Sequence, residues 1–292
     1  MTRALKGLGV AMVTPFDTEG KIDYPALQRL VKHLHTGADF LVVMGTTGEV
    51  ATLNPTEQMA VLDAVIDYNA EKLPIVFGIG GNNTANVCEE MARFDRAGVT
   101  AFLSASPAYN KPTQEGIYRH YMALSEASNL PIILYNVPGR TASNVLPATV
   151  KRIAQAADKV LGIKEAAGNM EQVMELSRIL PESFLLLSGD DALALPHMVC
   201  GGHGIISVIG NAYPKLFGDA VRSALARDFK IARDKHFSLL PMMQLIFAEG
   251  NPGGVKEVLK YMGICGNDMR LPLYPVSDVL SEKIRAEMGG LG

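Results

Sequence analysis

The stretch VLGIKEAAGN, residues 160–169, is an apolar run of strand character that ends in a single lysine, Lys164. A short β-rich run bounded by turn residues is typical of a buried strand. A charged amine is costly to place there unless it has a use, and burial lowers the pKa of a lysine, which favours the nucleophilic neutral amine. The pattern indicates either a catalytic lysine or, alternatively, a lysine that turns to the surface and pairs with Glu165.

Seven further runs of the same character recur along the chain: Gly9–Val13, Phe40–Met44, Ile75–Ile79, Ala101–Leu103, Ile132–Tyr135, Phe184–Leu187 and Ile205–Val208. Helix-length stretches with apolar residues at spacings of three and four lie between them. Strict alternation of strand and helix predicts an α/β fold, a (β/α)8 TIM barrel. The rival is a doubly wound sheet, but no GxGxxG fingerprint follows the first strand, and residues 78–83 lack its third glycine.

The alternation stops near residue 228. After it the chain shows three helical patterns: Lys230–Glu249, Pro252–Met262 and Val276–Met288. We therefore predict a catalytic barrel over residues 1–228 and a small C-terminal helical domain over residues 229–292. No flexible linker is expected between them.

The composition is that of a soluble globular protein, with 48% hydrophobic and 20% charged residues among 292. A net charge of −3 offers no polycation for nucleic acid and no basic helix for a membrane. Cys88, Cys200 and Cys265 are far apart and lack metal-ligand spacing, which favours a reducing compartment without disulfides. The short apolar run near the N-terminus stops at Thr14-Pro15, which favours a strand over a signal peptide. We therefore expect a cytoplasmic protein.

In a barrel of this kind the active site lies at the C-terminal ends of the strands. The turn GTTGE, residues 45–49, follows the second run and holds two hydroxyls that can bind a small carboxylate, although this motif taken alone favours a plain βα turn. Tyr135 closes the fifth run and Lys164 follows the sixth. Because neighbouring strands lie ~5 Å apart, this phenol and amine can form a proton-transfer pair.

Four motifs resemble, in order and spacing, the signatures of the dihydrodipicolinate synthase family: GTTGE at 45–49, YNVPGRT at 135–141, GIKE at 162–165 and SGDD at 188–191. The similarity runs over nearly the whole chain. It implies a class I aldolase-type lyase that condenses pyruvate with L-aspartate 4-semialdehyde to give 4-hydroxy-tetrahydrodipicolinate, on the route to diaminopimelate and lysine. No metal or other cofactor is expected, because the protonated imine nitrogen is the electron sink.

The resemblance also implies the catalytic residues. Lys164 matches the lysine that forms the Schiff base with pyruvate, and Tyr135 matches the general acid/base tyrosine. Thr46 matches the hydroxyl that relays the tyrosine's proton. Tyr109 matches a tyrosine that completes this relay from a neighbouring subunit, which makes a dimer the catalytic unit. Members of the family usually form tetramers of two such dimers, so a homotetramer is expected.

The substrate-binding residues follow in the same way. Thr47 matches a binder of the pyruvate carboxylate. Arg140 matches the arginine at the site mouth that receives the carboxylate of the semialdehyde. Gly189 and the backbone carbonyl of Ile206 match further wall positions.

Two other functions stay open. Related Schiff-base aldolases, such as N-acetylneuraminate lyase or 2-keto-3-deoxy sugar acid aldolase, resemble the Lys164 and Tyr135 positions but usually read GSTGE at the first motif. They also lack an arginine at the position of Arg140. The other alternative is a barrel that serves as a regulator or binding protein, and intact Lys164, Tyr135 and Thr46 oppose it.

Overall fold

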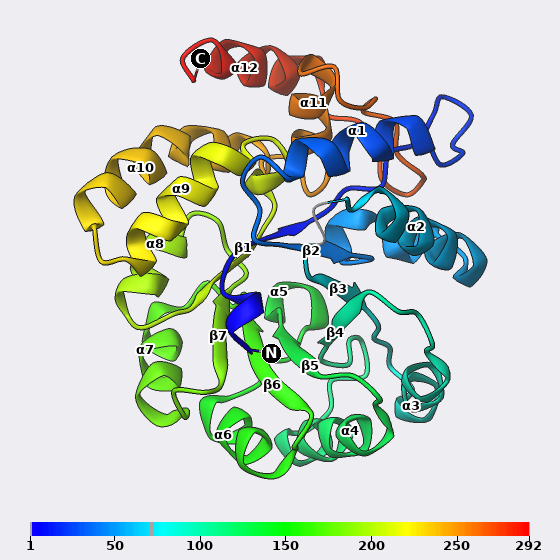
Figure 1. Cartoon of the computed structure of the whole chain (residues 1–292), viewed down its shortest axis with the longest axis vertical. Helices are drawn as coiled ribbons and strands as arrows, with labels where there is room; N and C mark the ends of the chain where they lie inside the picture. Colours follow the sequence, from blue (N-terminus) through cyan, green and yellow to red (C-terminus); the bar gives the residue numbers. More distant parts are fainter. Residues whose placement is uncertain (1, 71–72, 292) are drawn as a thin grey trace. The chain divides into compact units, whose positions relative to one another are not determined.

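The computed structural model describes residues 2–70 and 73–291. Its strands follow one another around a single closed barrel in the order β1 to β8, and the TIM barrel is confirmed (Figure 1). The strands are β1 Gly7–Ala11, β2 Phe40–Val43, β3 Ile75–Gly78, β4 Val99–Ala105, β5 Ile132–Asn136, β6 Val160–Glu165, β7 Leu185–Ser188 and β8 Gly204–Ser207.

Each of the eight predicted runs is a strand, with differences at the ends. Strand β4 is longer than its predicted core because it includes the polar residues Thr100 and Ser104, which interrupt the apolar pattern. Strand β6 continues through Lys164 to Glu165, so the lysine lies within the strand and not just after it. Pairing with both neighbouring strands holds this end of β6 extended.

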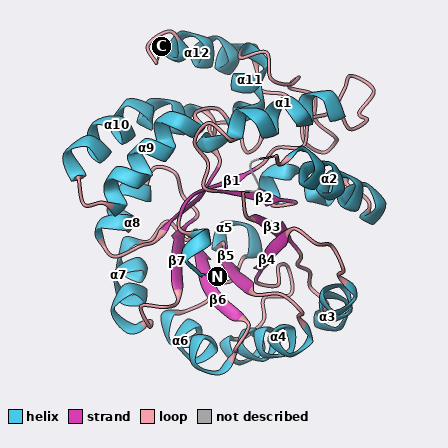
Figure 2. Cartoon of the chain, viewed as in Figure 1, coloured by secondary structure: helices cyan, strands magenta, loops and turns pink. Residues whose placement is uncertain are grey.

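The described chain divides into two compact units, and residues 2–6 and 74–206 make up the first. Outside strands β4 to β7 of this unit lie four helices, each in contact with the next (Figure 2). They are α3 Thr84–Arg93, α4 Gln114–Ala127, α6 Pro147–Ala156 and α7 Met170–Ile179. Three short helices complete the unit: η1 Thr2–Leu5, α5 Pro138–Thr141 and α8 Ala194–Val199. Apolar side chains at helical spacing, such as Ile117, Tyr121 and Leu124 of α4, are buried.

The second unit comprises residues 7–70, 73 and 207–291. Its elements besides β1 and β2 are α1 Tyr24–Leu34, η2 Thr46–Gly48, η3 Val50–Thr52, α2 Pro55–Tyr68, η4 Ile209–Asn211, α9 Pro214–Leu225, α10 Phe229–Leu245, α11 Gly253–Tyr261 and α12 Asp278–Met288. The three predicted C-terminal helices are therefore present. Helix α10 packs on α9, and α12 contacts both α10 and α11. The domain boundary near residue 228 stays a prediction.

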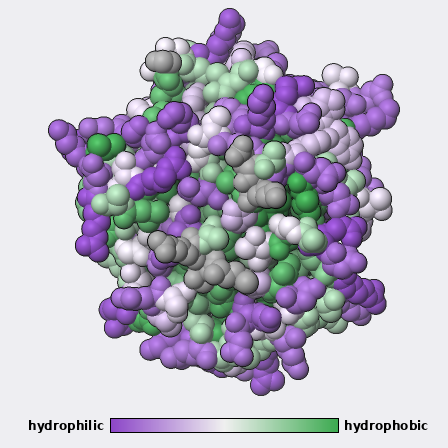
Figure 3. All heavy atoms as spheres, viewed as in Figure 1, coloured by the Kyte–Doolittle hydropathy of each residue, from purple (hydrophilic) through white to green (hydrophobic). Residues whose placement is uncertain are grey.

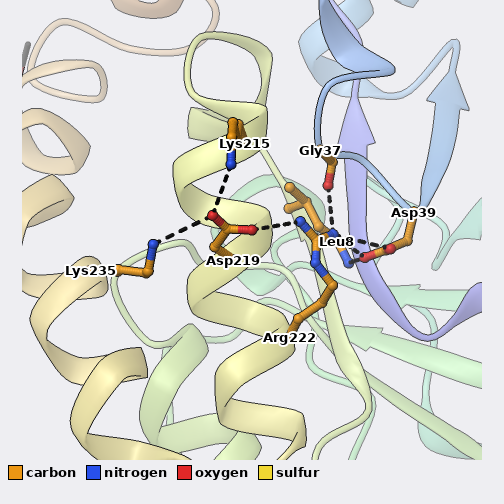
Figure 4. A network of polar contacts seen from close by, with 7 residues as sticks. All are labelled: Leu8, Gly37, Asp39, Lys215, Asp219, Arg222 and Lys235. Carbon is orange, nitrogen blue, oxygen red and sulfur yellow. Dashed lines mark hydrogen bonds and ion pairs between the residues drawn. The ribbon is translucent and has the colours of Figure 1, made fainter.

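A polar network ties helix α9 to the amino ends of β1 and β2 (Figure 4). Arg222 donates to the carbonyl of Gly37 at 2.9 Å and pairs with Asp39 at 3.2 Å. Asp39 in turn accepts from the backbone of Leu8 at 2.7 Å. Asp219 joins Arg222 to lysines of α9 and α10. Because these contacts lie at the start of the strands, they serve stability and leave the carboxyl ends open for chemistry.

On the face shown in Figure 3, hydrophilic and hydrophobic residues are interspersed and do not form separate large patches. This agrees with the small net charge of −3. Within residues 2–70 and 73–291, none of the helices has both the length and the apolar composition needed to cross a bilayer.

Candidate active site

Lys164 and Tyr135 meet at the carboxyl ends of neighbouring strands. The register of β5 and β6 places their Cα atoms opposite one another. The Lys164 amine lies 4.2 Å from the centroid of the Tyr135 ring. Lys164 is 6% exposed and Tyr135 is 8% exposed. The structure thus brings the two side chains together, and the alternative of a surface Lys164 paired with Glu165 is wrong.

Gly189, one of the predicted wall positions, lies against the side chain of this lysine. A Cβ atom at residue 189 would come within 2.9 Å of Lys164 Cε and 2.6 Å of Ala166 Cβ. A larger residue would therefore displace the Lys164 side chain. Ile206 is a buried residue of β8. Both residues belong to the first unit, as do Lys164 and Tyr135.

Arg140 and Tyr109 are placed differently from the buried pair. Arg140 is an exposed residue of α5, the short helix that begins two residues after β5 ends. Tyr109 is 90% exposed. It forms the centre of a three-residue turn closed by a 2.7 Å hydrogen bond from Asn110 N–H to the carbonyl of Ala108, with a φ of +66°. A positive φ is strained for a tyrosine, so this exposed position is costly to maintain.

A buried polar network surrounds Glu165, the residue that follows Lys164 in β6, and the sequence interpretation missed it. Glu165 accepts from Asn136 Nδ2 at 2.9 Å, from Gln172 Nε2 at 2.9 Å and from the backbone N–H of Ala167 at 2.7 Å. Asn136 and Gln172 use their second amide hydrogens on Asn144 Oδ1, at 2.8 and 3.1 Å. Asn144 donates back to Gln172 at 2.8 Å. Three donors thus bind the Glu165 carboxylate, and the three amide side chains are also hydrogen-bonded to one another.

Burial raises the pKa of Glu165, while the Asn136, Gln172 and Ala167 donors oppose the rise. The network also holds the loop that carries Arg140, because Val145 N–H donates to Asn136 Oδ1 at 3.0 Å. The sequence offers one indication of this network: a polar residue follows Tyr135 and another follows Lys164, namely Asn136 and Glu165. Asn136 and Glu165 are 0% and 3% exposed, which that pattern alone does not reveal.

Thr46 and Thr47 open the turn η2 in the second unit. Thr46 is half-buried, and Thr47 is 3% exposed. The side-chain amide of Asn251, from the segment between α10 and α11, donates to the Thr47 hydroxyl at 3.0 Å. The hydroxyl of Thr47 is therefore held in place by a residue far along the chain.

Glu49 ends the same turn in a left-handed conformation, with a φ of +56°. It forms an ion pair with Lys256 of α11, and both side chains are fully buried. Lys256 also donates to the carbonyl of Asp268 at 2.8 Å and lies 4.5 Å from the centroid of the Phe16 ring. Burial lowers the pKa of Lys256, and the charge of Glu49 opposes this shift. The pair fixes the turn that carries both threonines.

Sequence reasoning did not single out Asn251 or Lys256. A signal for Lys256 exists, because it lies in the largely apolar stretch GGVKEVLKY of α11, which is buried on nearly all sides. A lysine and a glutamate inside such a helix need partners. The sequence does not show which partners they find.

The whole chain is similar to enzymes of one known family. The profile of the Dihydrodipicolinate synthetase family matches residues 4–289. The chain belongs to this family. The 4-hydroxy-tetrahydrodipicolinate synthase of Flavobacterium psychrophilum is 49% identical over 283 residues, which cover 97% of each chain. This chain is therefore a lyase. The prediction of a 4-hydroxy-tetrahydrodipicolinate synthase is confirmed, in preference to the alternatives of N-acetylneuraminate lyase and sugar acid aldolase.

Solved structures of this family have the same fold. A monomeric variant of dihydrodipicolinate synthase has a TM-score of 0.95 at 35% identity, over 99% of this chain and 97% of the other. The dihydrodipicolinate synthase of Acinetobacter baumannii, solved in complex with pyruvate, has a TM-score of 0.94 at 36% identity, over 98% of both chains.

Proposed function

We propose that this protein condenses pyruvate with L-aspartate 4-semialdehyde through an imine on Lys164 and so forms 4-hydroxy-tetrahydrodipicolinate. The observation that carries the proposal is the buried pair of Lys164 and Tyr135, whose amine and ring lie 4.2 Å apart at the ends of β6 and β5. An amine beside a phenol supplies the nucleophile and the proton carrier that imine chemistry needs.

The chemistry begins at the Lys164 nitrogen. The amine attacks the keto carbon of pyruvate, water leaves, and a protonated imine forms. This imine withdraws electrons from the methyl group, which loses a proton and becomes a carbon nucleophile. The carbon attacks the aldehyde of the semialdehyde and takes its oxygen to a hydroxyl. The amino group of the semialdehyde then displaces Lys164 from the imine carbon, which closes the ring and frees the enzyme.

Each of these steps transfers a proton, and we assign this work to Tyr135, Thr46 and Tyr109. Thr47 binds the pyruvate carboxylate, and Arg140 binds the carboxylate of the semialdehyde. The four family motifs support these roles. The buried position of Tyr135 and the exposed position of Arg140 agree with them, since one faces the reacting atoms and the other meets the incoming substrate.

The exposed, strained Tyr109 supports an assembly in which a second copy supplies this residue. A tyrosine that is 90% exposed contributes little to its own subunit. We therefore place the working enzyme in the cytoplasm as a homotetramer built from two dimers. A monomeric variant exists among the related structures, so the assembly has to be measured for this chain itself.

A coupled assay with purified protein tests the proposal. With pyruvate and L-aspartate 4-semialdehyde, we expect formation of the cyclic product, and with N-acetylneuraminate we expect no cleavage above background. Borohydride added with pyruvate alone is expected to inactivate the enzyme by reducing the imine on Lys164. Turnover of the sugar acid without turnover of the semialdehyde would contradict the proposal.

A further inference from the structure

Asn251 is a polar residue beside the turn that we propose binds pyruvate, and it lies outside the four motifs quoted above. Its side-chain nitrogen lies 3.0 Å from the Thr47 hydroxyl oxygen. We propose that Asn251 is a positioning residue for pyruvate, which orients the Thr47 hydroxyl so that its hydrogen points to the substrate carboxylate. This inference rests on the proposed function, in which Thr47 binds that carboxylate.

The direction of the hydrogen bond decides what Thr47 can do. A hydroxyl donates one hydrogen and accepts through its lone pairs. Because Asn251 donates, the Thr47 oxygen is occupied as an acceptor and its hydrogen stays available. The reverse orientation of the amide would take that hydrogen for the Asn251 oxygen. A carboxylate only accepts, so only the first orientation serves pyruvate.

The unpaired end of the amide supports a role beyond structure. Asn251 Oδ1 is buried and has no hydrogen-bond partner among the residues that the structure describes. A buried acceptor without a partner is unfavourable, and an asparagine kept only for packing would be expected to satisfy both ends. At this position the nitrogen alone is used, and it is used on the hydroxyl of a substrate-binding residue.

The turn itself is held rigid by the same stretch of chain. Lys256, five residues after Asn251, makes the fully buried ion pair with Glu49. Residues 251–256 thus fix both Thr47 and the end of its turn. With the backbone held in this way, the hydrogen bond from Asn251 favours one rotamer of the Thr47 side chain and leaves its hydroxyl hydrogen to point elsewhere.

Trapping of pyruvate by borohydride, followed by mass spectrometry of the Lys164 peptide, measures this step without the second substrate. We expect Asn251→Ala to raise the pyruvate concentration for half-maximal trapping about three- to tenfold, as for loss of one hydrogen bond. Asn251→Asp should raise it further, by about tenfold or more, because its carboxylate accepts the hydroxyl hydrogen and repels pyruvate. The KM for the semialdehyde should stay within about twofold of the wild type.

A double-mutant cycle separates this role from a general one. In a Thr47→Val background, Asn251→Ala should change half-maximal trapping by less than about twofold, since it acts through the missing hydroxyl. Two results would overturn the inference. One is a double variant whose change in half-maximal trapping equals the product of the two single changes, and the other is an Asn251→Asp enzyme that traps pyruvate like the wild type. Asn251→Asp has nearly the shape of the wild-type residue, so it carries the test if Asn251→Ala unfolds early in thermal melts.

The wild-type enzyme distinguishes this failure from failure of the proposed function. A wild type that traps no pyruvate at Lys164 overturns both. If it traps pyruvate and turns over the semialdehyde, while the Asn251 variants match it, only the role of Asn251 is lost.

Discussion

At the scale of single residues, the proposed chemistry depends on Lys164. We expect Lys164→Ala to lower activity by at least about a thousandfold, because no imine can form. Mass spectrometry after borohydride reduction should find the pyruvyl adduct on Lys164 of the wild type and no adduct on the variant. Lys151→Ala, which removes an exposed lysine of α6, is the matched control and should keep full activity. An adduct on another lysine would contradict the assignment.

Arg140 should affect only the second substrate. We expect Arg140→Ala to trap pyruvate like the wild type but to lose several kcal/mol of transition-state stabilisation, on the order of a hundredfold or more in kcat/KM for the semialdehyde. The reason is that Arg140 is exposed on α5, whereas Lys164, on which we place the imine, is buried. Trapping titrations and turnover assays on the same preparation check this. An equal loss in both would mean that the arginine shapes the pyruvate site.

At the scale of elements, the sequence predicts what local patterns determine. Apolar runs identified all eight strands, and helical spacing identified α10 to α12. Strand β6 ran two residues further than predicted, because pairing on both sides keeps Lys164 and Glu165 extended despite their charge. The meeting of Tyr135 and Lys164 followed from strand order alone.

The polar networks around the site did not follow from the sequence. Glu49 and Lys256 are 207 residues apart, and no local pattern pairs them. Asn251 contacts Thr47 across 204 residues. Such contacts depend on the closed fold, so they emerge only when the fold is known.

The buried ion pair between η2 and α11 makes a stability prediction. Lys256→Met leaves Glu49 buried without its cation, which should lower the free energy of unfolding by about 3–5 kcal/mol. Arg178→Met is the control, since it removes an exposed pair with Glu175 that water screens and should leave the free energy of unfolding nearly unchanged. Urea unfolding followed by circular dichroism compares them. Equal midpoints for the two variants would show that the buried pair is not needed.

At the scale of the whole molecule, Tyr109 predicts an active site shared between subunits. Lys164→Ala and Tyr109→Phe should each be nearly inactive alone. When the two are unfolded together and refolded, mixed dimers carry one site with both residues intact, so roughly a quarter of the wild-type activity should return. Mixing without exchange is the control. No recovery, with mixed dimers confirmed by native mass spectrometry, would place Tyr109 in its own subunit's site or outside catalysis.

Two buried histidines make the molecule sensitive to acid. Burial lowers the pKa of His120 and of His197 to about 4, and for His197 the charge of His203 adds to the effect. The unfolded chain takes up these protons near pH 6.5, and the folded chain does not. The free energy of unfolding should therefore fall as the pH drops from 6.5 to 5, by on the order of 2 kcal/mol per histidine.

Urea unfolding at pH 7 and pH 5 checks this for His197. Among the described residues neither of its ring nitrogens has a hydrogen-bond partner, so His197→Leu removes the titration without breaking a bond. The variant should lose less stability between the two pH values than the wild type does. The same loss in both proteins would mean that other groups govern the acid response.

The order in which the ribosome makes this chain gives the contacts of residues 251–256 a further meaning. The turn at residues 45–49 is synthesised early, yet the lysine that neutralises Glu49 comes 207 residues later. Until Lys256 emerges, Glu49 stays hydrated and the turn is free to move. If the turn binds pyruvate as we propose, Lys164 is synthesised before the residues that complete the pyruvate site, and we expect activity only from chains that include residues 251–256.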